Sequence, residues 1–207
     1  MYSPSQKPVI VLASTSPRRI ELLKQVGLNP VVLSPHADET ALPRETPKQT
    51  VARLAREKAK SLSDRVFNEH GNALIIAADT IVVSPKGKVF NKPRDRAEAI
   101  RMLGVLAGNT HTVLTGYCIL SAKRTHVRVI SSRVRMRKLP RRDIERYVDS
   151  GEPMDKAGAY AAQGLGMALI ERISGSYMNV VGLPVAQVLQ DAENLFDFPL
   201  FSWELKR

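Results

Sequence analysis

Apolar residues in this chain occur either in short continuous runs or at helical spacing, and the two patterns alternate. The first run, Val9 to Ala13, is rich in β-branched residues, which predicts a strand buried on both faces. A polar loop, Ser14 to Ser16, follows it; Ser16 suits a helix N-cap and Pro17 the first helical position. Three apolar residues then recur along one face of the predicted helix: Ile20, Leu23 and Val26.

The same patterns continue along the chain and predict an α/β fold. Further strands are predicted at 31–33, 73–78, 81–83, 110–120, 126–138 and 168–173. The strands 110–120 and 126–138 read as an antiparallel hairpin. Helices are predicted from Pro47 to Leu62, from a capping box of Asp95 and Glu98 to Gly108, from Pro140 to Ser150, and from Leu183 onward. Loops are predicted at 63–71, 154–166 and 175–182.

Composition narrows the class of protein. The 207 residues, 43% of them hydrophobic, suffice for one well-buried core or two small lobes. No apolar run approaches the roughly 20 residues that cross a bilayer, and residues 1–8 lack the apolar core of a signal peptide. We therefore expect a cytoplasmic location. The single cysteine, Cys118, excludes an internal disulfide and is expected as a buried core thiol.

The formal net charge of +11 permits nucleic-acid binding, a polyphosphate substrate, or plain solubility. Alternating arginines in the predicted hairpin would line one face of a strand, which favours a solvated sheet face. No aromatic residues are interleaved with them, so a stacking platform for single-stranded nucleic acid is not expected. Much of the excess charge lies between 123 and 142, especially at Arg133, Arg135, Arg137, Lys138, Arg141 and Arg142.

Two arginines, Arg18 and Arg19, fall in the first turn of the first predicted helix. The unpaired N–H groups of a helix N-terminus carry partial positive charge, so cations there are disfavoured unless a polyanion binds. Small hydroxyl residues before such a helix and arginines in it outline a phosphate site. The alternative is a solvent-facing pair of arginines after an ordinary cap.

Asp79 follows the most apolar run of the chain, Ala73 to Ala78. A carboxylate in that place is costly to bury unless it is paired or binds a metal, which favours a functional role over a cap for the next turn. Neither a P-loop, a dinucleotide-binding glycine motif nor a CxxC motif is present. The histidines show no metal-ligand spacing and are expected as ordinary core or surface residues: His36, His70, His111 and His126.

Eight motifs occur in an order that resembles one known family. They are LASTSPRR, ADET, AREKA, AADT, NKP, HTVLTG, GEPMDKAGAYAAQG and GSYMNVVGLP. From about Val9 to Leu195 the chain resembles the Maf proteins, nucleoside triphosphate pyrophosphatases with a fold like that of inosine triphosphate pyrophosphatases. That resemblance implies a mixed, twisted, elongated sheet flanked by helices, in one domain of two lobes around a cleft. It also implies a homodimer. The aromatic tail, 196–207, is expected to pack on the body of the protein or on a partner subunit.

The late motifs also indicate a branch of the family. AYxxQG followed by GSYxNVVGLP resembles the branch that hydrolyses dTTP and UTP, whereas the sister branch that acts on 7-methyl-GTP differs in those loops. Modified pyrimidine nucleotides are further candidate substrates, as for an enzyme that cleans the nucleotide pool. The strand SSRVRMRKL departs from the usual threonine-rich pattern of the family, which affects only local surface properties.

The resemblance assigns roles to residues that match the family motifs. Asp79 matches the catalytic carboxylate, the general base for water attack on the α-phosphate, and with Glu39 it would hold Mg²⁺ or Mn²⁺. The positions implied for specificity are Arg18, Thr80 and Gln163. Those implied for phosphate binding are Ser14, Arg19, Lys58 and Lys92. The competing hypothesis is a nucleic-acid-binding or division-regulating protein without enzymatic activity, which would use the basic hairpin.

Overall fold

The computed structural model describes residues 7–40 and 42–198, and the chain divides into two compact units. The first unit holds the chain up to Asp79, then Gly116–Val129, and the part from Gly182 onward. The second unit holds Thr80–Thr115 and Ile130–Val181. Seven strands form one sheet in the order β2-β1-β3-β5-β6-β7, with β4 paired to β3. The structure confirms the predicted mixed α/β fold, a sheet flanked by helices.

Three parallel strands form the centre of the first unit. Strand β1 (Val9–Ala13) pairs in parallel with β2 (Val31–Leu33) and with the first part of β3 (Ala73–Val83). Ala13, the last residue of β1, lies opposite Ala77 of β3. The loop after β1 and Asp79 therefore lie at the same edge of this sheet, because parallel strands carry their carboxyl ends in the same direction.

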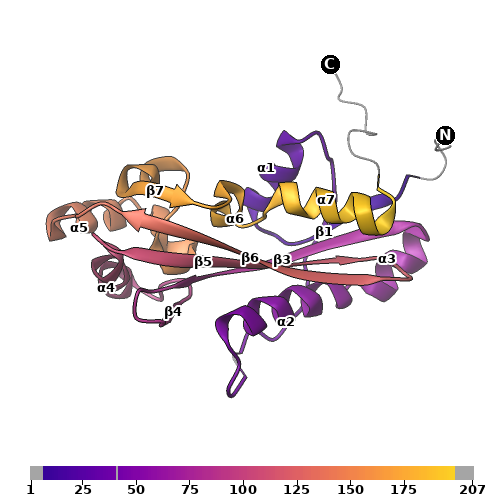
Figure 1. Ribbon diagram of the computed structural model, residues 1–207, viewed down its shortest axis with the longest axis horizontal. Coiled ribbons are helices and arrows are strands. Elements are labelled where there is room, and N and C mark those ends of the chain that lie inside the picture. The colour runs from indigo at the N-terminus through magenta and orange to yellow at the C-terminus, as the bar shows by residue number, and fades with distance from the viewer. Residues whose placement is uncertain (1–6, 41, 199–207) are drawn as a thin grey trace. The chain divides into compact units, whose positions relative to one another are not determined.

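Helices cover both faces of the strands in the first unit. Figure 1 shows α2 (Pro47–Lys60) and α3 (Ser63–His70) on one side, with α1 (Pro17–Gln25) and α7 (Val185–Phe196) on the other. Small residues on α2, Ala55 and Ala59, are fully buried and let this helix approach the sheet closely. The core on the α2 side consists of Val11, Ala13, Ala55, Ala59, Leu62, Val66, Ala73, Ile75, Ala77, Cys118 and Leu120.

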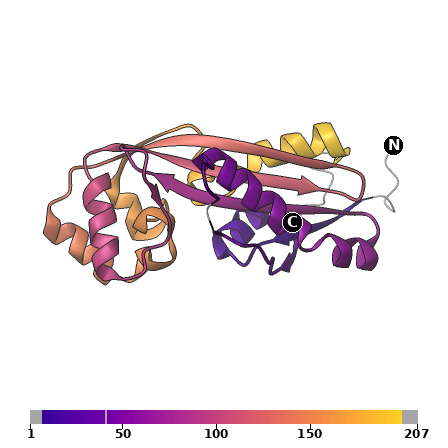
Figure 2. The same cartoon turned by 90° about the horizontal axis from the view of Figure 1, so that it is seen from below.

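The second unit is built around two helices and a run of short 3₁₀ turns. Figure 2 shows α4 (Arg96–Leu106) beside α5 (Arg141–Asp149) and the turns that follow α5. Met102, Leu103 and Tyr147 belong to the core that these helices share with the sheet. The remaining elements are β4 (Val89–Phe90), η2 (Glu152–Asp155), η3 (Ala157–Ala159), η4 (Gly164–Leu169), β7 (Ile170–Ser174) and α6 (Tyr177–Val181).

The predicted hairpin is present. Strands β5 (Thr110–Leu120) and β6 (Thr125–Met136) are neighbours in the sheet, and the Ser121 N–H donates to the Arg124 carbonyl across the turn. Residues of β6 alternate between exposed Arg133 and buried Val134, as the sequence pattern predicts. Strand β7 pairs antiparallel with β6 and places Arg172 directly opposite Arg135.

Several local predictions are wrong. Residues 63–70, predicted as a loop, form α3, because Asp64 suits its first turn and Val66 is fully buried beneath it. The predicted loop 175–182 contains the short helix α6. Strand β3 continues through Asp79 without the predicted interruption. The capping box is half formed: Asp95 accepts from the Glu98 N–H, but the Glu98 carboxylate accepts from the Arg94 N–H instead.

The aromatic tail is only partly within the described ranges. Phe198 is buried, whereas Phe201 and Trp203 lie outside the described residues. Among the helices of the described ranges, none combines the length and the apolar character that crossing a membrane requires.

Candidate functional site

The loop between β1 and α1 is held by the hydroxyl of Ser14, which is only 5% exposed. Its Oγ accepts from the backbone N–H of Ser16 at 3.1 Å and from Nη1 of Arg19 at 3.3 Å. Ser16 occupies the N-cap position as predicted, but its side chain makes no capping bond. Ser14 therefore fixes this loop at the N-terminus of α1, a kind of helix end that commonly binds anions.

Arg19 is a half-buried cation at the start of α1. Its Nε donates to the carbonyl oxygen of Gly182 at 2.8 Å, which joins the first sequence motif to the last. Burial lowers the pKa of Arg19; the charge of Asp79 opposes this effect, neighbouring Arg18 adds to it, and Glu39 opposes it. A guanidinium remains protonated even so, and its planar fork suits phosphate oxygens.

Lys58 of α2 joins the two acidic residues of the predicted site. Its Nζ lies 2.7 Å from Oδ1 of Asp79 and 2.7 Å from Oε1 of Glu39. The side chains of Lys58 and Asp79 are each 12% exposed, whereas that of Glu39 is 67% exposed. The buried Asp79 carboxylate is therefore paired, which meets the physical requirement that its place in an apolar strand imposes.

The acidic pair has the composition of a divalent-cation site that is completed by a substrate. Both carboxylates already lie within hydrogen-bond distance of one cationic nitrogen, so they tolerate a positive charge between them. No cluster of three metal-ligating side chains occurs in the part of the chain that the structure describes. Mg²⁺ in proteins commonly uses one or two carboxylates, and phosphate oxygens and waters complete its coordination. Glu39 and Asp79 fit that requirement.

Within the second unit, Thr80 rests on a buried polar network. Its Oγ1 lies 2.9 Å from Oγ1 of Thr115, which donates to the carbonyl of Asn179 at 3.0 Å. The fully buried Asn179 amide donates to Val113 O at 3.2 Å and to Ser132 Oγ at 3.0 Å. Reasoning from the sequence missed Asn179 as an organising residue, although it stands inside the motif GSYMNVVG.

The side-chain ammonium of Lys92 and the side-chain amide of Gln163 are both unpaired within the described residues. The side chain of neither residue makes a hydrogen bond or an ion pair within residues 7–40 and 42–198. Lys92 is exposed and follows Asn91, whose carbonyl accepts from the Gly158 N–H at 3.1 Å. Gln163 is half-buried at the start of η4. Their ammonium and amide groups are therefore available to a ligand.

The structure links five of the predicted residues within the first unit. Ser14 contacts Arg19, Lys58 contacts both Glu39 and Asp79, and Arg19 interacts electrostatically with both carboxylates. Arg18 belongs to the same helix turn and influences Arg19. The other three predicted residues, Thr80, Lys92 and Gln163, belong to the second unit.

A second cluster of charged groups in the first unit has a structural role. Asp191 of α7 accepts from the hydroxyl of Tyr117, from Nη1 of Arg128 at 3.1 Å, and pairs with Nε2 of His126 at 2.8 Å. Burial alone would raise the pKa of Asp191, but the hydrogen bonds from Tyr117 and His126 and the charge of Arg128 bring it below its ordinary value. This cluster fastens α7 to the β5–β6 hairpin.

The other titratable core residues match the expectation of ordinary packing. His111 is buried against the hydroxyl of Tyr160 at 2.7 Å, and burial lowers its pKa to about 4. Burial raises the pKa of Cys118 to about 11, so this thiol is a core residue rather than a nucleophile.

A paired carboxylate, a half-buried arginine and a helix N-terminus at one sheet edge are typical of α/β proteins that handle phosphorylated ligands. The comparison with known families specifies the class further. The chain belongs to the family described as Maf-like protein, whose model matches residues 9–195.

Curated relatives resemble the chain over most of its length. A dTTP/UTP pyrophosphatase of Symbiobacterium thermophilum is 47% identical over 193 residues, which cover 93% of this chain and 96% of the relative. One of Syntrophomonas wolfei is 47% identical over 179 residues, covering 86% and 92%. One of Shewanella denitrificans is 46% identical over 183 residues, covering 86% and 91%.

Proposed function

We propose that this protein is a nucleoside triphosphate pyrophosphatase that hydrolyses dTTP and UTP to the monophosphate and pyrophosphate. The observation that carries the proposal is Lys58, whose ammonium pairs with Asp79 and Glu39 at 2.7 Å each, while Arg19 interacts electrostatically with both carboxylates. The names of the relatives support the reaction and the pyrimidine substrates. The same proposal extends to modified pyrimidine nucleotides.

The cationic residues and the loop after β1 would bind the triphosphate. Such a substrate carries about four negative charges near neutral pH, so its site needs several cations. Arg18 and Arg19 offer guanidinium groups at a helix N-terminus, where the helix dipole also favours an anion. Lys58 and Lys92 would add point charges, and the Ser14 hydroxyl would keep the loop in its conformation.

Asp79 would accept a proton from the water that attacks the α-phosphorus. The water oxygen forms a bond to phosphorus while the bond to the bridging oxygen breaks, and pyrophosphate leaves with that oxygen. In this scheme the hydrogen bond from Lys58 orients the Asp79 carboxylate before the substrate binds. The cationic side chains stabilise the charge that develops on the leaving pyrophosphate.

Glu39 and Asp79 would hold a divalent cation, Mg²⁺ or Mn²⁺. The bound cation would supply positive charge that stabilises the phosphate oxygens in the transition state. Lys58, which contacts both carboxylates in the structure, would then share them with the cation.

Gln163 and Thr80 would recognise the base. The Gln163 amide offers one donor and one acceptor group, which match the O4 and N3–H edge shared by uracil and thymine. Acceptance of both dTTP and UTP implies that neither the 5-methyl group nor the 2′-hydroxyl is strongly discriminated.

The test measures pyrophosphate release from a panel of nucleoside triphosphates with Mg²⁺ or Mn²⁺. We expect release from dTTP and UTP that EDTA abolishes, and a loss of about 100-fold or more in kcat for Asp79→Asn. The matched control is Asp191→Asn, because both carboxylates are nearly equally buried and hydrogen-bonded within the first unit. Near-wild-type activity of Asp79→Asn would contradict the assigned base. Preferential hydrolysis of 7-methyl-GTP would instead indicate the sister substrate.

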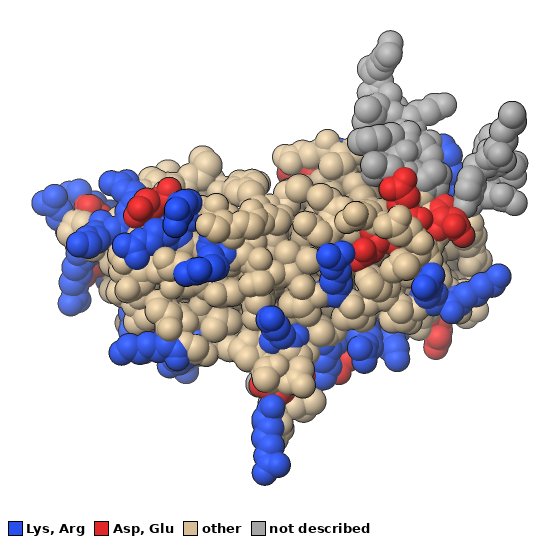
Figure 3. Space-filling model, viewed as in Figure 1, with Lys and Arg blue, Asp and Glu red and all other residues tan. Residues whose placement is uncertain are grey.

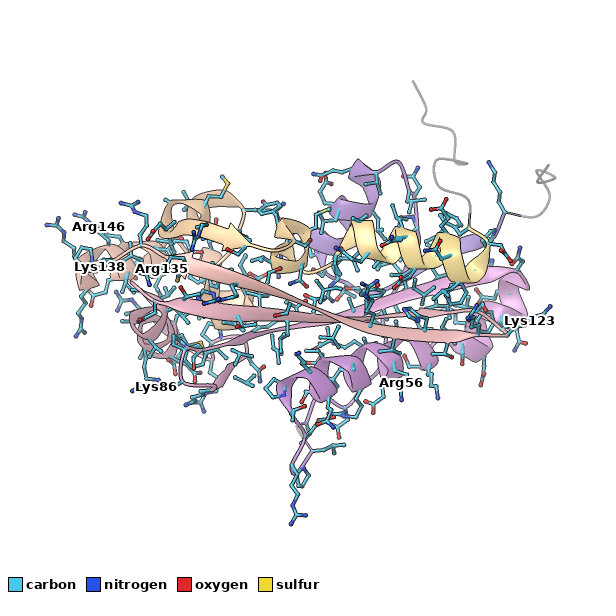
Figure 4. All side chains as sticks on the ribbon, in the orientation of Figure 1. Arg56, Lys86, Lys123, Arg135, Lys138 and Arg146 are labelled. Carbon is cyan, nitrogen blue, oxygen red and sulfur yellow. The ribbon has the colours of Figure 1, made fainter. Side chains whose placement is uncertain are left out.

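The competing hypothesis, a nucleic-acid-binding protein, relies on the basic surface of the second unit. Figure 3 shows lysine and arginine side chains gathered over α5 and the adjoining end of β6, where Figure 4 labels Arg135, Lys138 and Arg146. Several of these cations have acidic partners: Arg135 with Glu171 at 3.6 Å, Arg141 with Glu145 at 2.8 Å, and Arg146 with Asp143 at 3.8 Å. This pairing favours a solvated salt-bridged surface.

Two further expectations extend the proposal: a homodimer and a cytoplasmic location. Sedimentation of the purified protein tests the first, with the mass of two chains expected. Fractionation of cells that produce the protein tests the second.

A further inference from the structure

The segment from Tyr160 to Gly166, called here the glutamine loop, carries Gln163. We propose that Glu152, acting with Tyr147, is a positioning residue that fixes this loop and thereby sets the preference for uracil and thymine bases. This inference rests on the proposed function, in which Gln163 contacts the base.

Glu152 binds the glutamine loop just after Gln163. Its Oε2 accepts from the Leu165 N–H at 2.9 Å, and its Oε1 accepts from the Gly166 N–H at 2.8 Å. Burial alone would raise the pKa of Glu152, but these backbone hydrogen bonds and one from Tyr147 bring it below its ordinary value. Glu152 is therefore ionised at neutral pH, and its hydrogen bonds are charge-assisted.

Tyr147 binds the loop just before Gln163. Its buried hydroxyl donates to Oε1 of Glu152 at 2.9 Å and accepts from the Ala161 N–H at 3.1 Å. The hydroxyl thus connects the Glu152 carboxylate to the backbone on the other side of the loop. The backbone is held two residues before Gln163 and again two residues after it.

Two glycines allow this close approach. A Cβ atom on Gly164 would lie 2.4 Å from Oε2 of Glu152, and the positive φ of +65° already favours glycine there. A Cβ atom on Gly166 would lie 2.2 Å from the Ala161 carbonyl and 2.8 Å from the Tyr147 hydroxyl. The spacing Gln163-Gly164-Leu165-Gly166 therefore follows from the space that the carboxylate and the hydroxyl occupy.

The rest of the loop is also fastened, whereas the Gln163 side chain is not. Tyr177 donates to the Ala162 carbonyl at 3.1 Å, and the Tyr160 hydroxyl pairs with His111 at 2.7 Å. Within the described ranges the Gln163 amide has no hydrogen-bond partner. A fixed backbone that presents an unpaired amide lowers the entropic cost of binding a base through that amide. Glu152 supplies the rigidity and Gln163 supplies the recognition.

The test compares kcat and KM for UTP and CTP in wild type, Glu152→Gln, Tyr147→Phe and Gln163→Ala. In Glu152→Gln an NH₂ group can face an N–H donor, so the loop loses one anchor and the remaining bonds lose their charge. We expect the ratio of kcat/KM for UTP over CTP to fall about 10- to 100-fold, mainly through a higher KM for UTP. Tyr147→Phe, which removes only the hydroxyl, should reduce the same ratio less.

A double-mutant cycle separates positioning from simple destabilisation. If Glu152 acts through Gln163, adding Glu152→Gln to Gln163→Ala should not reduce the UTP over CTP ratio further. Glu145→Gln, on the neighbouring helix α5 and paired with Arg141, is the control and should leave the ratio unchanged. Wild-type release of pyrophosphate from no nucleotide would overturn the proposed function. Wild-type activity with an unchanged ratio in both Glu152→Gln and Tyr147→Phe would overturn the positioning role alone.

Discussion

At the scale of single residues, Lys58 links the charged groups of the candidate site. This ammonium neutralises Asp79, a carboxylate inside an apolar strand, and reaches Glu39 on the loop after β2. Asp79 and Glu39 are 40 positions apart in the numbering of the chain. The Lys58 side chain therefore connects both candidate metal ligands.

Replacing Lys58 by methionine should abolish this arrangement while keeping much of the apolar stem. We expect kcat for UTP to fall about 100-fold, because Asp79 loses its orientation and the phosphates lose a cation. Steady-state kinetics with a thermal melt check the result. An unchanged kcat, with the fold intact, would show that the pair is only structural.

Asp191 predicts a pH dependence of stability. Its pKa is lower in the folded protein than its ordinary value of 3.8, so its ionised form stabilises the fold above that value. This stabilisation is lost as the pH falls through the lowered pKa. We expect Asp191→Asn to cost about 1–3 kcal/mol at pH 7, and the difference from wild type to shrink below about pH 4. Urea unfolding of both proteins across pH 3 to 7 measures it.

The sequence was sufficient to identify candidate site residues, but not to identify which side chains contact a buried charged group. Asp79 stood out because an apolar strand carries it, and Arg18 and Arg19 stood out against the helix dipole. The Asp191 cluster could not be found, because its partners Tyr117, His126 and Arg128 are 63 to 74 positions away in the chain. Pairings over such separations depend on the sheet register, which local patterns do not contain.

At the scale of elements, the position of Lys58 depends on helix α2, and the position of α2 depends on its contact with strand β5. The backbone of Gly116 passes so close to α2 that an added Cβ atom would lie 2.3 Å from the carbonyl oxygen of Val51. The approach is possible only without a side chain at this position.

Gly116→Ala should therefore displace α2. We expect a loss of about 1–3 kcal/mol in the free energy of unfolding, together with reduced activity because Lys58 moves. The control is Gly104→Ala inside α4, where a Cβ atom meets nothing within 4 Å. That change should stabilise the protein by about 0.5–1 kcal/mol. Equal effects of the two substitutions on unfolding would contradict this explanation.

Elements with strong periodicity were predicted well, and those without it were not. Helix α2 and the two long hairpin strands have apolar residues at regular spacing, and their predicted bounds agree with the structure within a few residues. Helix α3 was missed because only Val66 and Phe67 in it are apolar, too few to form a periodic pattern. The short 3₁₀ turns after α5 are held by Glu152 and Tyr147, and no periodic pattern marks such contacts.

At the scale of the whole molecule, the net charge of +11 is compatible with both functional hypotheses, but removing surface arginines should affect them differently. We expect the triple substitution of Arg133, Arg135 and Arg172 by serine to leave kcat/KM for UTP within twofold of wild type. The same variant should bind single-stranded DNA more weakly at low salt and reduce the salt slope by about 0.7 per lost phosphate contact. Fluorescence anisotropy over a salt series measures the slope. A large loss of UTP hydrolysis would contradict this expectation and assign these arginines a part in catalysis.

The division of the chain into two units has a consequence for how the protein can evolve. The chain passes from one unit to the other four times, after Asp79, Thr115, Val129 and Val181. Three of these passages lie inside the strands β3, β5 and β6. Neither unit corresponds to one contiguous stretch of gene, so recombination at a single breakpoint cannot exchange a unit between relatives. We therefore expect substrate preference to diverge by point substitutions within loops rather than by exchange of modules.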